Sequence, residues 1–239
     1  MRGLGTIINV AAIIAGGILG LFFRKGLKPR FQEILMQVMS VSVMFLGLSG
    51  ALSGLLEVNA DGSLASTRSM ILIFSLLLGS LAGEALNIEG GMERFGVWLR
   101  KRANAGDDDG FLNAFLTASL TVCVGAMAVV GSIQDGLMGD YSMLAAKALL
   151  DMVIIMVYAS TMGKGVIFSA IPVGIFQGSI TALAGLVAPL LTDAAVLGLS
   201  FVGSVLVFCL GANMAFQKNF HVANMLPSLV VAAVSMSLF

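Results

Sequence analysis

The chain has few of the residues from which soluble proteins build charged surfaces and active sites. Only 11% of its residues are charged, it has one histidine, His221, and both cysteines, Cys123 and Cys209, fall within apolar stretches. These residues offer no disulfide framework, no set of metal ligands and no catalytic triad. The chain also lacks a glycine-rich phosphate loop with a lysine, and its 13 basic and 13 acidic residues balance. We therefore expect no enzymatic activity, no cofactor and no binding to nucleic acid.

Apolar residues are abundant instead. They make up 58% of the chain, and the mean hydropathy of +1.01 is far above that of a soluble domain. Because about 20 apolar residues in a helix cross a hydrocarbon core about 30 Å thick, the sequence predicts an all-α polytopic protein of the lipid bilayer. We interpret residues 1–239 as a single integral-membrane domain. The eight predicted spans are 3–23, 34–56, 70–86, 111–131, 144–162, 166–191, 194–216 and 222–239.

Charged residues outside the spans predict how the chain is oriented. Residues 88–105 mix apolar side chains, Trp98 among them, with basic ones, which is typical of an amphipathic helix on the membrane surface. Cytoplasmic loops retain lysine and arginine, so the helix 88–105 is predicted to be cytoplasmic and both termini to face outward. The basic loops contain Arg24, Lys25, Lys28, Arg30, Arg94, Arg100, Lys101, Arg102, Lys164 and Lys218.

Two opposite charges, Lys147 and Asp151, lie four residues apart within the predicted span 144–162. On insertion scales a charge at the bilayer centre costs about 2.5–3.5 kcal/mol, so the pair is a candidate functional site. Three interpretations stay open. The two charges could neutralise each other as a structural tie, Lys147 could extend to the membrane surface, or the pair could serve proton coupling or attract an anion.

Further polar residues lie inside or next to the spans. The segment 131–140 combines Gln134, Asp135 and three glycines, which indicates either a plain external turn or irregular backbone at an ion or substrate site. Asn9, Gln177 and Asn213 fall within other spans, where amide side chains commonly tie helices together. The candidate residues for a substrate or ion path are Asn9, Gln134, Asp135, Lys147, Asp151, Gln177 and Asn213.

Short sequence echoes indicate internal symmetry. Residues 123–128 resemble 209–215, and residues 73–75 match 167–169; in both cases the two copies are three spans apart. An odd number of crossings inverts a repeat, so residues 31–131 and 141–216 are predicted to form an inverted pair of three-helix units. In transporters of that design the binding site lies near the bilayer midplane.

Four stretches also carry a resemblance to a known family. They are Gly131-Ser132-Ile133-Gln134-Asp135-Gly136 followed by Lys147 and Leu150-Asp151, Thr6-Ile7-Ile8-Asn9-Val10-Ala11, Phe168-Ser169-Ala170-Ile171-Pro172 with Gln177-Gly178-Ser179-Ile180, and Val222-Ala223-Asn224-Met225-Leu226-Pro227. The chain resembles the YdfK/YqgA-like family of bacterial inner-membrane proteins, long catalogued as a domain of unknown function. The resemblance implies a location in the inner membrane but no substrate. It also implies that the characteristic residues are Asn9, Gln134, Asp135, Lys147, Asp151, Gln177, Asn213 and Asn224.

Two functional hypotheses follow. The first is a transporter or channel whose polar residues line a path for a small ion or polar solute, driven by protons or sodium. The second is a structural or regulatory membrane protein whose polar residues tie its helices together. Asp151 and Gln177 would face a common cavity in a transporter, but would be dry and fully paired in a scaffold. Eight spans are few for a transporter, which favours a homodimer joined through a glycine-rich face such as that of the first span.

Overall fold

A computed structural model describes residues 2–26, 28–59, 61–102, 109–123, 126–187, 189, 192–216 and 220–238, and it is mostly helical. Residues 103–105 of the predicted amphipathic helix and the basic residue Lys218 lie outside the described residues. The elements are α1 (Leu4–Gly26), α2 (Pro29–Leu55), β1 (Leu56–Val58), β2 (Leu64–Ser66), α3 (Ser69–Leu86), α4 (Ile88–Arg102), α5 (Asp109–Cys123), α6 (Ala126–Met138), α7 (Ser142–Met162), the 3₁₀ helix η1 (Lys164–Ser169), α8 (Ala170–Ala182), α9 (Ala184–Val187), α10 (Asp193–Phe216) and α11 (Pro227–Leu238).

The chain divides into two compact units. Unit 1 comprises Met1–Met39, Gly91–Cys123 and Met127–Pro189, and unit 2 comprises Ser40–Gly90, Val124–Ala126 and Leu190–Phe239. The division falls within α2 and α4 and does not follow the proposed repeats 31–131 and 141–216. The inverted repeat and the single integral-membrane domain therefore stay predictions.

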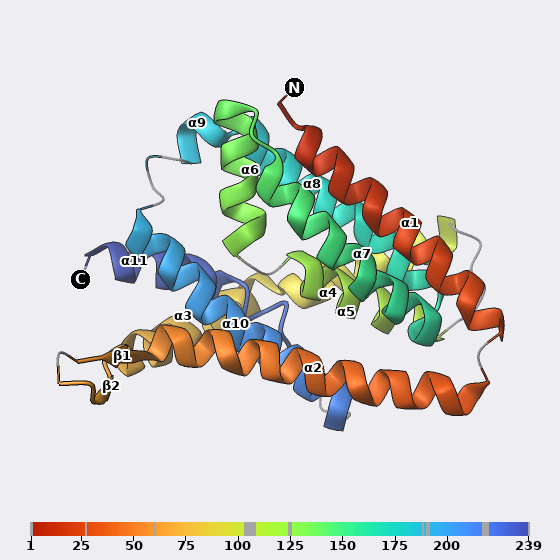
Figure 1. The fold of residues 1–239 in the computed structure, drawn as a ribbon, viewed down its shortest axis with the longest axis horizontal. Coiled ribbons are helices and arrows are strands. Elements are labelled where there is room, and N and C mark those ends of the chain that lie inside the picture. Colours follow the sequence, from red (N-terminus) through yellow and green to blue (C-terminus); the bar gives the residue numbers. More distant parts are fainter. Residues whose placement is uncertain are drawn as a thin grey trace. The chain divides into compact units, whose positions relative to one another are not determined.

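Unit 1 is organised around α1 and α7, which lie side by side along their length (Figure 1). Glycines on α1 allow this close approach. A Cβ atom at Gly16 would collide with the carbonyl oxygen of Met152, and one at Gly20 with that of Met156. Small residues at such positions let two helix backbones pack closely, which is the usual way that helices associate in a membrane.

A second layer of unit 1 packs α5 against η1 and α4. Phe111, Phe115 and Leu99 form a buried cluster, and the rings of Phe111 and Phe168 have centroids 5.3 Å apart. Helix α4 is amphipathic as predicted: Leu99 is buried, whereas Trp98, which stacks on the ring of Phe95, is 56% exposed. Its apolar face covers α5, and its basic end stays exposed.

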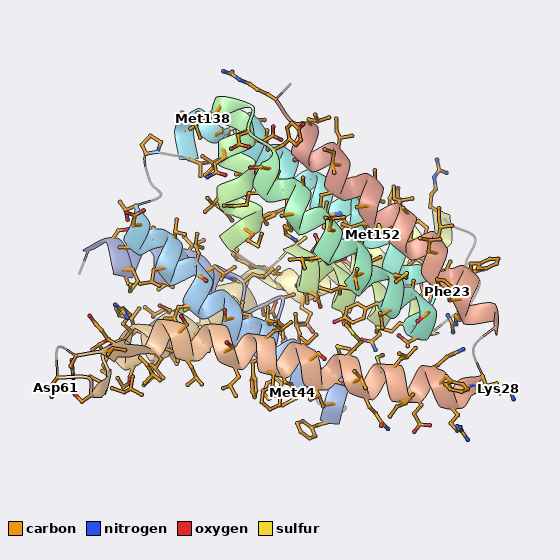
Figure 2. All side chains as sticks on the ribbon, viewed as in Figure 1. Phe23, Lys28, Met44, Asp61, Met138 and Met152 are labelled. Atoms are coloured by element: carbon orange, nitrogen blue, oxygen red, sulfur yellow. The ribbon has the colours of Figure 1, made fainter. Side chains whose placement is uncertain are left out.

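Contacts at the two ends of unit 1 show which loops share a side. The backbone amides of Gly3 and Gly5 donate to Asp135, so the start of α1 lies beside the end of α6. At the opposite end α7 stops at Gly163, whose φ of 97° suits glycine, and the Arg24 guanidinium lies against it. Met138 and Phe23 mark these two ends in Figure 2.

Unit 2 packs α3 and α10 against α11. Gly79 and Gly83 on α3 face the backbone of Ser228 and Asn224, where a Cβ atom would collide. The apolar core contains Phe201, Val202 and Ala232, with Leu55, Leu72, Leu76 and Leu229 packed around it. Between α2 and α3, β1 and β2 form an antiparallel hairpin with Leu56 opposite Ser66, an element that the sequence analysis did not predict.

The helices agree with an all-α polytopic membrane protein. Among the described residues, six helices are long and apolar enough to cross a membrane, and the bent pair α5 and α6 would add a seventh if it forms one span. Helix α11, at 12 residues, is shorter than such a span. The predicted count of eight spans therefore stays a prediction.

The predicted span 111–131 corresponds to α5 and the first part of α6, whose directions differ by 61°. One local prediction was wrong. The segment 131–140 is not irregular backbone or a plain turn, because α6 continues to Met138 and only the link around Gly139, with a φ of 72°, turns the chain. The backbone N–H and C=O groups of this segment, which were expected to lack regular partners, are hydrogen-bonded within the helix.

The glycine-rich face of the first span is also used differently from the prediction. Gly16 and Gly20 pack against α7, and a Cβ atom at Gly17 would collide with Ile167 in η1. Packing within unit 1 already covers this face, so it is not available as a homodimer interface.

Replacing Gly16 or Gly20 by alanine should separate α1 from α7 and lower the stability of the protein. We expect each substitution to cost about 1–3 kcal/mol, because a methyl group would meet backbone that cannot yield easily. Thermal unfolding in detergent would measure the loss. Gly178→Ala is the matched control, since nothing lies within 4 Å of its added Cβ atom. Equal stability of all three variants would contradict close packing at α1 and α7.

Candidate functional site

Helix α7 carries the charged pair on its buried face. The buried residues Leu144, Lys147, Asp151, Ile155 and Tyr158 recur every three or four positions, which places them on one stripe of the helix. Opposite this stripe, Leu149 and Leu150 are exposed. The two charges therefore point into unit 1 because the helical period aligns them with the apolar residues of the packing face.

Lys147 bonds within the protein and does not extend to the membrane surface. Its Nζ lies 2.5 Å from Asp151 Oδ2 and 2.8 Å from the carbonyl oxygen of Val122 on α5. The Lys147 side chain is 9% exposed and that of Asp151 is 5% exposed. The interpretation that Lys147 reaches the membrane surface is therefore wrong, and the ammonium and carboxylate form a mutually neutralised buried pair.

Two amide side chains complete this polar network. Asn9 on α1 donates from Nδ2 to Asp151 Oδ2 at 3.0 Å and to Gln177 Oε1 on α8 at 3.3 Å. Because the nitrogen of Asn9 must face these acceptors, its Oδ1 is left over, as is Nε2 of Gln177. Both atoms are buried, and no described residue bonds to either one. Each costs about 1–3 kcal/mol if nothing else satisfies it.

Two threonines extend the line of unsatisfied atoms. Thr6 precedes Asn9 by three residues on α1, and Thr181 follows Gln177 by four on α8, so each lies about one helical turn from its amide. The hydroxyl oxygens of both threonines are buried without a partner among the described residues. We call Thr6, Asn9, Gln177 and Thr181 the polar strip.

A cavity of about 610 Å³ adjoins the end of this strip that Thr6 and Thr181 form. Its volume falls within the range of about 300–1,000 Å³ that is typical of small-molecule sites. Thr6 and Thr181 line it, and the Arg2 side chain, which donates to the carbonyl oxygen of Leu137, borders it. The walls come from α1, α6, α8 and α9 and include Gly136, Gly178, Ala182 and Ala184.

The other predicted path residues have different surroundings. Asp135 caps α1: its Oδ1 accepts from the Gly3 amide at 3.1 Å and its Oδ2 from the Gly5 amide at 2.9 Å. Gln134 is half-buried on α6. Asn213 belongs to unit 2, where both atoms of its amide bond to the backbone of Phe220. The structure thus brings together Asn9, Lys147, Asp151 and Gln177.

Unit 2 contains a polar cluster that the sequence analysis did not predict. Asn224 donates to Glu84 Oε2 at 2.6 Å and accepts from the backbone amide of Glu89 at 2.7 Å, while His221 pairs with Glu89 at 3.1 Å. Its members come from two distant parts of the sequence, residues 84–89 and 221–224, so no local pattern indicates the cluster. Thr6 and Thr181 were also missed, although their spacing from Asn9 and Gln177 is a usable signal.

The apolar helices and the buried charged network together define a polytopic α-helical membrane protein. The chain belongs to the family described as "Protein of unknown function (DUF554)", which matches residues 4–237. It is 31% identical over 230 residues to the "Uncharacterized membrane protein YdfK" of Bacillus subtilis strain 168, covering 96% of this chain and 94% of the relative. It is 28% identical over 233 residues to the "Uncharacterized protein YqgA" of Escherichia coli strain K12, with the same two coverages. The resemblance to the YdfK/YqgA-like family is therefore confirmed. No solved structure matches the chain.

Removing Lys147 alone should destabilise the protein more than removing the whole pair. Lys147→Met leaves the Asp151 carboxylate buried without its counter-charge, which costs roughly 3–5 kcal/mol, whereas Lys147→Met with Asp151→Leu should recover most of this. Reversible unfolding in mixed detergent micelles would measure both variants. Arg68→Met is the control, because Arg68 pairs with the half-exposed Glu57 at 3.6 Å and should lose at most about 1 kcal/mol. If the single and double variants are equally stable, the two charges do not interact.

Proposed function

We propose that this protein is an inner-membrane transporter or channel for a small ion or polar solute. The route runs through unit 1, from the cavity along the polar strip to the pair Lys147 and Asp151. Both termini face outward, and α4 lies on the cytoplasmic side. The solute moves without enzymatic chemistry, driven by a proton or sodium gradient.

The observation that carries this proposal is a contrast between amide side chains of the two units. Asn213 and Asn224 in unit 2 have both atoms of their amide groups bonded, as expected of structural ties. Asn9 and Gln177 each keep one buried polar atom without a partner among the described residues. Native proteins satisfy buried polar groups with protein, water or ligand, so the site around Asn9 and Gln177 is suited to hold a small polar molecule.

The position of the cavity supports a route and not an isolated polar pocket. Thr6 and Thr181 belong both to the cavity wall and to the strip that leads to Asn9 and Gln177. The strip ends at the ionisable pair Lys147 and Asp151, and ionisable side chains inside a membrane typically mark substrate and ion pathways because each one is costly in hydrocarbon. A path that begins at a cavity and reaches a buried ion pair meets the requirement of a transport site.

A scaffold role remains the second candidate, and one contact favours it. The Lys147 ammonium bonds to the Val122 carbonyl as well as to Asp151, so the pair ties α7 to α5, and Asn9 ties it to α1. Such a network strengthens the packing of three helices whether or not a solute passes. Flux measurements separate the two roles.

Purified protein in proteoliposomes should move a small solute in a screen of cations, anions and small organic acids under proton and sodium gradients. Asp151→Asn should lower that flux by about tenfold or more, because the buried charge that the path requires is lost. Asp193→Asn is the matched control, an acid-to-amide change in the first turn of α10 in unit 2. Size-exclusion profiles would confirm that both variants stay folded.

Absence of flux for every solute under both gradients would support the scaffold role. Unchanged flux in both Asp151→Asn and Lys147→Met would show that the pair is structural and that the route lies elsewhere.

Accessibility to a membrane-impermeant thiol reagent would test the orientation. In a chain with Cys123 and Cys209 replaced by alanine, Asp61→Cys at the tip of the hairpin should react in intact cells. Lys28→Cys, in the first basic loop, should react only after permeabilisation. The reverse pattern would place both termini in the cytoplasm.

A further inference from the structure

The polar strip offers more than a place for a solute, because it reaches a single titratable acid. Thr6 and Thr181 lie at the level of the cavity, Asn9 and Gln177 one helical turn further along α1 and α8, and Asp151 accepts a hydrogen bond from Asn9. Within their level Asn9 and Gln177 bond to each other, with Asn9 Nδ2 3.3 Å from Gln177 Oε1. The strip is therefore a series of hydrogen-bonding groups from the cavity to the carboxylate.

The leftover atoms of the strip fit water. Thr6 and Thr181 each offer a hydroxyl that can donate and accept, Asn9 Oδ1 accepts and Gln177 Nε2 donates. A buried water needs two to four polar partners and enough room. Room for water is present in the cavity, which Thr6 and Thr181 line, and nothing lies within 4 Å of a Cβ atom built on Gly178 in its wall.

We propose that Asp151 exchanges protons with the cavity through waters held by the polar strip, which makes the proton the coupling ion of the transporter. This inference rests on the proposed transport function and names its driving ion. The proton passes from water in the cavity to the Asp151 carboxylate, while Lys147 keeps its own proton and its bond to the Val122 carbonyl. The pair changes from neutral to a net charge of +1.

A metal cation fits the same position poorly. The Lys147 ammonium, 2.5 Å from Asp151 Oδ2, already occupies the place where a cation would bind the carboxylate. The next acid along the route, Asp135, has both oxygens bonded to the backbone of α1. Within the described part of the chain no group of three or more His, Cys, Asp or Glu residues could hold a metal ion.

Few other titratable groups face Asp151. On its own helix the nearest is Lys147, and on α5 the half-buried Cys123 follows Val122, whose carbonyl oxygen accepts from Lys147. From α8 the strip contributes the neutral Gln177. Helix α1 contributes Asn9; Arg2 precedes its start, its charged residues Arg24 and Lys25 lie at its end, and η1 begins at Lys164. Protonation of Asp151 is therefore governed by Lys147 and by access to water.

Infrared spectroscopy of the reconstituted full-length protein would test the route without any solute. The carboxyl band that appears at low pH in the wild type and is missing in Asp151→Asn reports protonated Asp151. The band shifts when deuterium replaces the carboxyl proton, so the time course of the shift after transfer to D₂O measures how fast that proton exchanges with water. Thr181→Val removes one hydroxyl of the strip with little change of shape, and we expect it to slow this exchange by about tenfold.

Ser179→Val is the matched control on the same helix, because the Ser179 hydroxyl is exposed and bonds to the carbonyl oxygen of Phe176 outside the strip. Gly178→Leu is a second test that fills the cavity without a clash at Cβ, and it should slow exchange as Thr181→Val does.

The proton route is overturned if no Asp151-dependent carboxyl band appears across the pH range in which the protein stays folded. It is equally overturned if exchange is as fast in Thr181→Val and Gly178→Leu as in Ser179→Val. If the protein moves a solute but the Asp151 carboxyl band is missing, the proton is not the coupling ion, whereas the transport function stands. If the band appears with the expected exchange rates but no solute moves, the transport function is refuted, whereas proton access to Asp151 stands.

Discussion

The packing of unit 1 depends on the bond between the Lys147 ammonium and the Asp151 carboxylate. Two charges removed from water need each other and further hydrogen bonds, which here come from the Val122 carbonyl and the Asn9 amide. These partners belong to α5 and α1, so the pair on α7 can stay buried only while all three helices are packed together. The glycines that bring α1 against α7 therefore serve the polar network as well as the packing.

Unit 1 thus combines a tightly packed side with a looser one. Along α7, α1 has no room for a methyl group at Gly16 or Gly20, whereas towards α8 it borders a cavity and carries polar atoms without partners. Rigid packing on one side holds the ion pair, and the cavity on the other side is where the proposed route to it begins. A buried charge that is both held and reachable is what a transport site requires, whereas a scaffold requires only the first.

Much of the fold could be predicted because hydropathy is a local property. The apolar spans and the amphipathic α4 follow from stretches of about 20 residues read without their neighbours. The segment around Gln134 and Asp135 was misjudged for the same reason: glycine and aspartate favour turns in isolation, yet here they continue a helix whose carboxylate caps α1, 130 residues away. The polar residues were predicted from the free-energy cost of placing them in a membrane. That cost is the same for Asn213, whose amide is fully hydrogen-bonded, and for Asn9, whose Oδ1 has no partner among the described residues.

The sequence by itself determined the class of protein, the positions of most membrane helices, and which residues are costly enough in a bilayer to need a partner. Only the tertiary structure decided which partners they find. Asn9 meets Asp151 across 142 residues and Gln177 across 168. Such contacts depend on which helix faces pack against each other, and that choice is made by the fit of small and large side chains over whole helices. No short stretch of sequence contains it.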